Sequence, residues 1–159
     1  MTEPDQTAEG EPLVADIMVT DVVTARPDMS VKELAELLRE KAVGGAPVVD
    51  DDGDLIGMVT EGDLMALDAD LEFPHYIQFL DSVIYLERAS KFEERLKKAV
   101  AATVRDIMTN EVLTVRPDDP VREAATLMSE HRIDRIPVEE DGKLVGIVGR
   151  HEVLKVLGL

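Results

Sequence analysis

Hydrophobic and polar residues follow one another in a pattern that occurs twice along the chain. In the first occurrence, a short β-branched run at 22–25 leads into a stretch with apolar residues at helical spacing. Apolar runs at 46–49 and 55–60 then flank the turn signal Asp52-Gly53 and predict a hairpin. Residues 61–67 open a second helix. The predicted order of elements is therefore β-α-β-β-α.

The ends of the first helix in each copy carry recognisable signals. Ser30 with Glu33 three residues later predicts a capping box at the first of these helices. Gly44-Gly45 is expected to break that helix. In the second copy, Asp119 is expected to cap the helix and Pro120 to take its first position, which suits a fixed φ.

The second half of the chain repeats motifs of the first in the same order. Val14, Asp16, Ile17 and Met18 recur as Val104, Asp106, Ile107 and Met108; Pro47-Val48 recurs as Pro137-Val138; Asp52-Gly53 recurs as Asp141-Gly142. Such correspondence indicates a duplication. One copy alone buries little apolar surface, whereas two copies can share a core. We therefore expect an α/β (α+β) fold in which two βαββα copies pack with pseudo-twofold symmetry.

The repeat also divides the chain into segments. The two copies span 13–67 and 103–159, and residues 1–12 are expected to form a disordered acidic tail. Residues 68–102 have no counterpart in the repeat. Their apolar content and a helical pattern at about 91–101 predict an ordered helical insertion between the copies.

Composition narrows the function classes. The 159 residues are 45% hydrophobic, which supports a folded core, and their net charge of −17 disfavours nucleic acid and anionic membrane surfaces as partners. The absence of cysteine excludes disulfides and thiolate chemistry. No stretch is apolar enough for a membrane helix and the N-terminus is acidic, so we expect a cytoplasmic protein.

Candidate chemistry concentrates at the end of the second strand, where Thr60 meets a helix start and Asp63 follows one turn later. A carboxylate at such a place can bind both hydroxyls of a ribose, and backbone N–H groups at a helix start favour anions. The same Thr-x-x-Asp spacing is also a capping box that needs no ligand. Both interpretations stay open on spacing alone.

Catalytic and metal motifs are not visible. The histidines His75, His131 and His151 are scattered, and no nucleophile–base pair or nucleotide-binding loop of the Walker type occurs. The acidic run at 50–52 with Gly53 fits a hairpin turn better than a calcium loop, which needs a closing Glu. We therefore predict neither an enzyme nor a metal site, and no required cofactor.

Taken together, these motifs resemble the CBS motif, named for cystathionine β-synthase, over most of the chain. The resemblance implies a CBS-domain pair with clefts between its repeats, where this family commonly binds AMP, ADP, ATP or S-adenosylmethionine. It also implies a homodimer. In the family pattern the Thr-x-x-Asp carboxylate binds ribose and the Thr faces phosphate, while residues of the first strand and around Pro-Val line the base pocket.

Carried onto this sequence, the resemblance assigns ligand-binding roles in both copies. In the first copy, Asp63 would bind ribose, Thr60 would face phosphate, and the base would be framed by Thr24, Ala25, Gly45, Ala46, Pro47 and Val48. In the second copy, the corresponding residues are Thr114, Arg135, Ile136, Pro137 and Glu152, and Arg150 is added as a candidate because its guanidinium can offset phosphate charge.

The second copy departs from the family pattern. Gly149 replaces the Thr, so a hydroxyl is lost, and Glu152 replaces the Asp, so its carboxylate is one methylene longer. Arg135 and Arg150 are unusual in so acidic a chain and can offset phosphate charge near a ligand. The alternative is that they form surface ion pairs of little energetic weight.

The expected function is a standalone regulatory module that binds an adenosine-containing ligand between its repeats and signals by a change in conformation or dimer. The regulated partner is unknown. The alternative, favoured by the departures at Gly149 and Glu152, is a structural or dimerisation module that has lost ligand binding.

The net charge of −17 generates a prediction about salt. If the acidity is an adaptation to a salty cytoplasm, the free energy of unfolding should rise steeply with salt, because screening relieves self-repulsion. If the protein is merely acidic, the rise should be small. Urea unfolding at several NaCl concentrations distinguishes the two cases.

Overall fold

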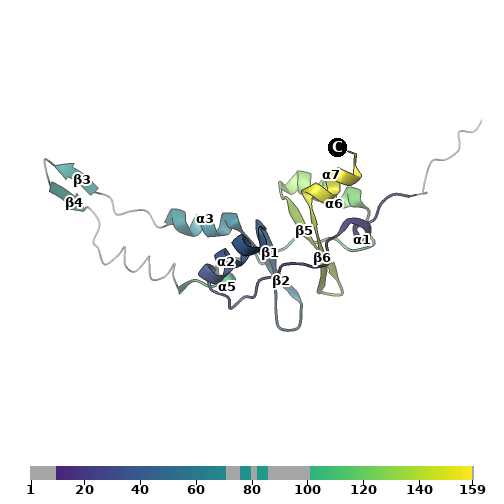
Figure 1. Cartoon of the computed structure of the whole chain (residues 1–159), viewed down its shortest axis with the longest axis horizontal. Helices are drawn as coiled ribbons and strands as arrows, with labels where there is room; N and C mark the ends of the chain where they lie inside the picture. Colours follow the sequence, from purple (N-terminus) through teal and green to yellow (C-terminus); the bar gives the residue numbers. More distant parts are fainter. Residues whose placement is uncertain (1–9, 71–75, 80–81, 86–100, 159) are drawn as a thin grey trace, which may run out of the picture. The chain divides into compact units, whose positions relative to one another are not determined.

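The computed structural model describes residues 10–70, 76–79, 82–85 and 101–158 (Figure 1). These residues belong to two compact units. The first-copy unit comprises Val23–Asp50 and Ile56–Asn110, and the second-copy unit comprises Met1–Val22, Asp51–Leu55 and Glu111–Leu159. Within the described ranges, no helix has both the length and the apolar character that crossing a membrane requires.

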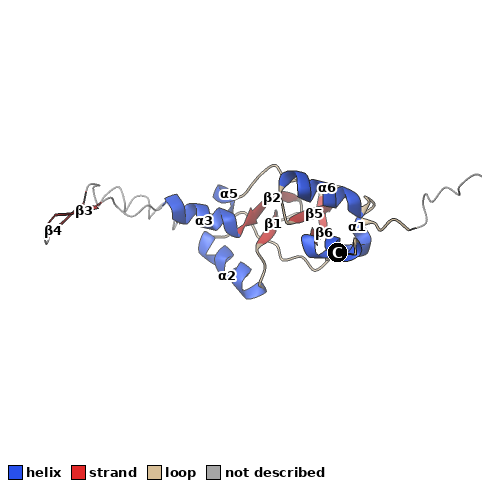
Figure 2. Ribbon diagram, turned by 90° about the horizontal axis from the view of Figure 1, so that it is seen from above, coloured by secondary structure: helices blue, strands red, loops and turns tan. Residues whose placement is uncertain are grey.

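The first-copy unit is a hairpin covered by helices. In chain order it contains α2 (Val31–Lys41), β1 (Gly45–Val49), β2 (Leu55–Thr60), α3 (Glu61–Asp70) and α5 (Val104–Ile107). β1 and β2 form a two-stranded sheet, and the elements of both units are distinguished by type in Figure 2. The core consists of Ala25, Leu34, Leu38, Ala46, Val48, Val59 and Val104.

The second-copy unit has the same construction. Its elements are α1 (Val14–Ile17), α6 (Val121–His131), β5 (Arg135–Glu140), β6 (Lys143–Gly149) and α7 (Arg150–Val156). β5 and β6 pair antiparallel, with Arg135 opposite Gly149 and Ile136 opposite Val148. The core consists of Val14, Val115, Val121, Ala124, Met128, Ile136, Val138, Val148 and Val153. The mixed α+β class predicted from the repeat is confirmed.

The predicted insertion is described only in part. It contains an antiparallel hairpin of β3 (Tyr76–Phe79) and β4 (Ser82–Tyr85), in which Tyr76 pairs with Tyr85. Most of the helix expected at about 91–101, and most of the expected acidic tail at 1–12, lie outside the described residues. Those predictions stay predictions.

The short helices α1 and α5 each belong in sequence to one copy and pack with the core of the other. The Val14 N–H donates to the Asp119 carbonyl at 2.8 Å, and the Val104 N–H donates to the Met29 carbonyl at 2.8 Å. Both valine side chains are fully buried in those cores. The copy boundaries at 13–67 and 103–159 therefore describe the repeat in sequence, while the compact units exchange their leading helices.

Helix ends follow the sequence signals with two corrections. The Ser30–Glu33 capping box is confirmed, with hydrogen bonds of 2.9 and 3.1 Å. The helix α6 has Pro120 as its N-cap residue, and the Asp119 carboxylate instead accepts the Arg116 N–H at 2.7 Å. The helix α2 ends before the glycines, because Ala42 already adopts a left-handed conformation with φ 52°.

The strands also follow the predicted pattern, except at the start of each copy. The run predicted at 22–25 is reduced to a single parallel bridge between Ala25 and Val48. The hairpin turn is confirmed in the second copy, where Asp141 and Gly142 have φ of 52° and 80°, as a tight turn with two left-handed residues requires.

In each unit, a methionine side chain lies against a glycine of the second hairpin strand, at equivalent positions. A Cβ built on Gly57 would lie 2.6 Å from Met108 Sδ and 3.0 Å from the Thr109 carbonyl oxygen. That carbonyl cannot retreat easily, because it accepts the Met58 N–H at 3.0 Å while the Thr109 N–H donates to Met58 at 2.9 Å. Gly146 has the same relation to Met18 and the Val19 carbonyl. Glycine is thus required for this close approach.

We expect Gly57→Ala to lower the free energy of unfolding by about 1–3 kcal/mol, the usual cost of overpacking. Gly62→Ala is the matched control, because its Cβ would meet only Thr60 Oγ1 at 3.4 Å on an exposed helical turn. That control should gain about 0.5–1 kcal/mol from helix propensity. Urea unfolding of both variants measures the difference, and equal stabilities would show that the Met108 segment yields without cost.

Candidate functional site

The predicted site residues of the first copy gather around β1. The Ala25 N–H donates to the Pro47 carbonyl at 2.9 Å, and the Val49 N–H donates to the Ala25 carbonyl at 3.0 Å. The Glu61 N–H donates to the Gly44 carbonyl at 2.9 Å, which holds the start of α3 beside the start of β1. One local surface of the first-copy unit therefore contains the 24–25 segment, β1 and the Thr60–Asp63 turn.

Burial divides these residues into two groups. The Ala25, Gly45, Ala46, Pro47 and Val48 positions are buried, so they can offer a ligand little beyond backbone. Thr24, Thr60 and Asp63 are half-buried and carry the polar side chains of this surface. A ligand that binds here would obtain its polar contacts mainly from these three side chains.

Asp63 forms the capping box that the sequence left as one of two alternatives. Its Oδ2 accepts the Thr60 N–H at 2.8 Å and the Thr60 hydroxyl at 3.3 Å. Both bonds use the same oxygen, so within the described part of the chain Oδ1 makes no protein hydrogen bond. Capping and ligand binding are thus compatible at this carboxylate, because an ionised carboxylate has two accepting oxygens.

Asp63 differs from most capping carboxylates of this chain in its burial. Asp16, Glu33 and Asp106 accept equivalent N–H bonds but are exposed, whereas Asp63 and Glu152 are half-buried. At Asp106, hydrogen bonds from the Thr103 backbone and hydroxyl hold the pKa of the carboxyl below its usual value. The half-buried pair occupies equivalent positions in the two copies.

The second copy builds the same surface with different side chains. The Val115 N–H donates to the Pro137 carbonyl at 3.1 Å, and the Arg150 N–H donates to the Asp134 carbonyl at 2.8 Å. Arg135 and Pro137 lie on the face of β5 opposite the buried Ile136, as strand alternation requires. Thr114, Arg135 and Glu152 are half-buried, and Arg150 is exposed.

The arginines of this surface have different partners. Arg150 Nη2 lies 2.9 Å from Asp134 Oδ1, and both side chains are about 60% exposed, so this ion pair contributes little to stability. Arg135 makes no ion pair within the described ranges. Surface ion pairing was the alternative to ligand binding that the sequence left open for both arginines. It applies to Arg150 and not to Arg135.

The two departures from the Thr-x-x-Asp pattern compensate each other. Glu152 Oε2 accepts the Gly149 N–H at 3.0 Å, close to the 2.8 Å of the Asp63 bond in the first copy. A Cβ on residue 149 would lie only 2.5 Å from that Oε2. The longer carboxylate therefore reaches the same N–H through the space that glycine leaves. Sequence reasoning treated the two changes separately and missed this coupling.

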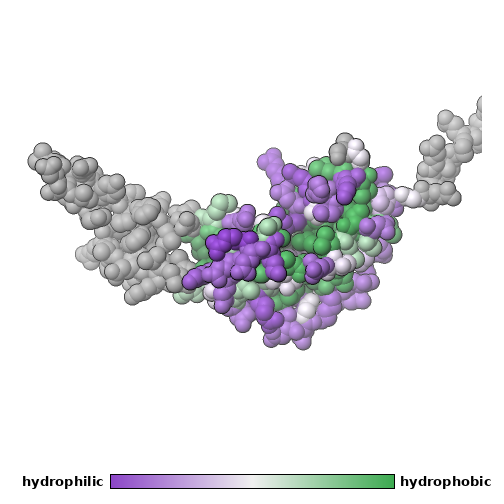
Figure 3. Space-filling model, viewed as in Figure 1, coloured by the Kyte–Doolittle hydropathy of each residue, from purple (hydrophilic) through white to green (hydrophobic). Residues whose placement is uncertain are grey.

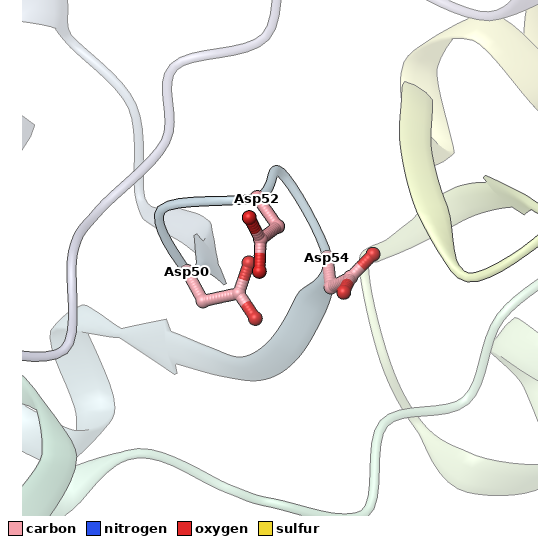
Figure 4. A group of neighbouring side chains, drawn as sticks. All are labelled: Asp50, Asp52 and Asp54. Carbon is pink, nitrogen blue, oxygen red and sulfur yellow. The ribbon is translucent and has the colours of Figure 1, made fainter.

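A cluster of carboxylates lies in the turn between β1 and β2. One oxygen from each of Asp50, Asp52 and Asp54 lies within 4.8 Å of the others (Figure 4). Lys143 Nζ lies 2.6 Å from Asp54 Oδ1 and donates to the Asp52 carbonyl at 2.7 Å. An ammonium therefore already offsets part of this charge, and we assign no metal to the turn.

The comparison with known proteins identifies the family. Residues 14–70 and 104–159 each match the family model described as CBS domain. The chain therefore belongs to the CBS-domain family and contains two such domains, which confirms the resemblance inferred from the repeat.

Individual relatives differ in how much of their own length the match covers. The chain is 34% identical to an uncharacterised protein of Methanocaldococcus jannaschii over 91% of this chain and 90% of the relative. It is 35% identical to the chloroplastic CBS domain-containing protein CBSX2 of Arabidopsis thaliana, over 82% of this chain and 56% of that one. An inosine-5′-monophosphate dehydrogenase of M. jannaschii is 28% identical, but the match covers only 22% of that enzyme.

Two of the solved structures that resemble this chain contain ligands. CBSX2 in complex with AMP superposes with a TM-score of 0.71 and 32% identity, over 91% of this chain and 95% of that chain. A CBS domain pair in complex with 5′-methylthioadenosine and S-adenosyl-L-methionine gives a TM-score of 0.67 and 27% identity, over 94% and 98% of the two chains. These ligands were bound by the proteins in those two structures.

The compensation at Gly149 can be tested by a double-mutant cycle. We expect Gly149→Thr alone to destabilise the protein by about 1 kcal/mol or more, because the new Cβ displaces the Glu152 carboxylate from its N–H. The double variant Gly149→Thr/Glu152→Asp recreates the first-copy pair and should recover most of that loss, a coupling of about 0.5–3 kcal/mol. Urea unfolding of the four proteins gives the coupling, and strictly additive effects would contradict it.

Proposed function

We propose that this chain is a regulatory CBS-pair module that binds an adenosine-containing ligand of the AMP, ADP or ATP class and has no catalytic activity of its own. S-adenosylmethionine is a further candidate. AMP is bound to CBSX2 in a solved structure whose chain resembles this one over 91% of this chain and 95% of that chain, and this supports the adenosine class. The observation that carries the proposal here is the half-buried Asp63 carboxylate with its unused Oδ1.

In the first copy, Asp63 Oδ1 is the proposed acceptor for ribose hydroxyls, since Oδ2 is engaged by Thr60. A ribose bound there would replace water at a partly desolvated carboxylate, where charge-assisted hydrogen bonds are strong. Thr60 and Thr24 would provide hydroxyls, and the backbone of β1 would contact the base. The buried β1 residues would then determine shape rather than polar recognition.

The second copy is the better candidate for phosphate. Arg135 stands where the first copy has Gly45, and Arg150 stands where it has Glu61. A half-buried guanidinium with no carboxylate partner in the described residues is suited to an anionic oxygen. Glu152 retains a second oxygen, Oε1, for a hydroxyl, because its cap uses only Oε2. Thr114 and the backbone at Ile136 and Pro137 would frame the base.

Regulation requires that the ligand bind two states of the module with different affinity. We propose that the module is a homodimer and that ligand binding changes its conformation or its association. The regulated partner would respond to that change. We propose a cytoplasmic location, as expected from the sequence. The described residues include no membrane-spanning helix, and the chain is acidic.

A structural or dimerisation module without a ligand is the second candidate function. The observation that favours it is that the Asp63 and Glu152 carboxylates already satisfy backbone N–H groups as caps. Caps of this kind are useful to a helix without any ligand. This candidate predicts that melting temperature does not depend on nucleotides.

Calorimetry with AMP, ADP, ATP and S-adenosylmethionine tests the proposal directly. We expect at least one to bind, and Asp63→Ala to weaken binding at the first copy by about tenfold or more through loss of a charge-assisted hydrogen bond. Glu33→Ala is the matched control, because it removes an exposed capping carboxylate away from the site and should leave affinity unchanged.

Thermal shift gives an independent readout, since a ligand at 100 times its Kd adds about 2.7 kcal/mol to the free energy of unfolding. A melting temperature indifferent to all four ligands, together with silent calorimetry, would reject the ligand-binding proposal and leave the structural module.

A further inference from the structure

We propose that the two copies select their ligands by charge, so that the first copy takes an adenosine ligand with a positively charged group on its 5′ carbon and no phosphate. Adenosine sulfonium compounds, such as S-adenosylmethionine, form that chemical class. This inference rests on the proposed ligand-binding function and deepens it, because it states which ligand class each copy takes. It also assigns Glu61 as the residue that determines the choice in the first copy.

The two candidate surfaces carry different charges at four equivalent positions of the repeat. These positions are Gly44, Gly45, Glu61 and Asp63 in the first copy and Asp134, Arg135, Arg150 and Glu152 in the second. The backbone around them is the same, since the Glu61 N–H donates to the Gly44 carbonyl at 2.9 Å. The Arg150 N–H donates to the Asp134 carbonyl at 2.8 Å. The first copy therefore has two negative charges where the second copy has two of each sign.

The Glu61 carboxylate is available to a ligand. It is exposed, and it forms no hydrogen bond or ion pair with any residue that the structure describes. It directly follows Thr60, and the proposed ribose acceptor Asp63 is two residues further on. In the family pattern, the Thr of the Thr-x-x-Asp motif faces the phosphate, which is attached to the 5′ carbon of the ribose. Glu61 is thus placed next to the residue that would face a 5′ substituent.

The first-copy surface acts against phosphate and in favour of a cation. The 24–25 segment, β1 and the Thr60–Asp63 turn contain no basic residue that could offset a phosphate charge. In S-adenosylmethionine, a sulfonium replaces the phosphate on the 5′ carbon. A carboxylate attracts a sulfonium and repels a phosphate through the same Coulomb interaction. Glu61 therefore favours the sulfonium ligand and disfavours AMP, ADP and ATP.

The second-copy surface has the opposite preference. Arg135 is half-buried and forms no ion pair within the described ranges, and Arg150 stands where the first copy has Glu61. These guanidinium groups would repel a sulfonium and attract a phosphate. Each ligand is selected by side chains of a single unit. The module would then respond to two ligands, with a sulfonium at the first copy and a nucleotide at the second.

Calorimetry with a matched pair of ligands tests the selection by charge. S-adenosylhomocysteine differs from S-adenosylmethionine only in lacking the sulfur methyl group and the positive charge. We expect S-adenosylmethionine to bind about three- to tenfold more tightly, as one charge interaction at a partly exposed site gives. This advantage should shrink at about 1 M NaCl through screening. Equal affinities for the two ligands at low salt would overturn the selection by charge.

Glu61→Gln removes the charge of an exposed side chain without breaking any described contact, so the variant should fold like the parent. We expect it to lose the advantage of S-adenosylmethionine over S-adenosylhomocysteine. Glu33→Gln is the matched control, because it removes one carboxylate charge at the start of α2, over which the surface is hydrophilic (Figure 3). Its amide oxygen can still cap the helix. An advantage that survives in Glu61→Gln would overturn the assignment of Glu61.

Competition between ligands tests the division between the copies. Protein saturated with AMP should bind S-adenosylmethionine with nearly unchanged affinity, because the two ligands occupy different copies. Glu61→Arg gives the first copy the charge of the second, so AMP should then bind at both copies and compete with S-adenosylmethionine. Displacement of S-adenosylmethionine by AMP in the parent protein would overturn the division and leave ligand binding intact. Silent calorimetry with every ligand would instead reject the proposed function on which the inference rests.

Discussion

The constraint on which this structure depends is that neither hairpin is complete without a segment that belongs in sequence to the other copy. Thr109 pairs with Met58 on β2, and Val19 pairs with Ile147 on β6. These segments approach closely because Gly57 and Gly146 have no Cβ, so that Met108 and Met18 lie against the bare backbone. The duplication therefore produces two units whose folding is linked through exchanged segments, and removal of either segment would leave a β-strand edge unpaired.

This exchange also positions the candidate ligand surface. The exchanged segments pair with β2 and β6. These strands end at Thr60 and Gly149, where α3 and α7 begin, and in both places a capping carboxylate accepts the backbone N–H of the last strand residue. The capping carboxylate reaches the same backbone N–H in both copies, by a short side chain beside threonine in one and by a long side chain beside glycine in the other. The two copies thus keep one backbone geometry while their side chains diverge in charge, with Gly45 and Glu61 in one and Arg135 and Arg150 in the other. A duplicated module can in this way present two unequal binding surfaces.

Several sequence predictions succeeded for local physical reasons. The hairpins were predictable because Asp-Gly turns and apolar alternation act within a few residues, and the Ser30–Glu33 box because capping is a three-residue interaction. The errors lay at the run 22–25, which forms one bridge instead of a strand, and at helix ends. Ala42 ends α2 in a left-handed conformation that glycine would adopt more easily, and Pro120 is the N-cap of α6 because Asp119 is engaged by Arg116. In both places a neighbouring contact outweighed the intrinsic preference of the residue.

By itself, the sequence determined the duplication, the α+β class, the family and the Thr60/Asp63 candidate, because repeats, periodicity and short motifs are properties of residues close together in the chain. Only the tertiary structure decided that α1 and α5 pack with the opposite copies, that Gly149 makes room for Glu152, and that Arg150 has a carboxylate partner while Arg135 has none among the described residues. These relations join residues that are distant in sequence or depend on interatomic distances of a few tenths of an ångström. Neither kind of information is present in a linear pattern, since both arise only when the backbone brings side chains together.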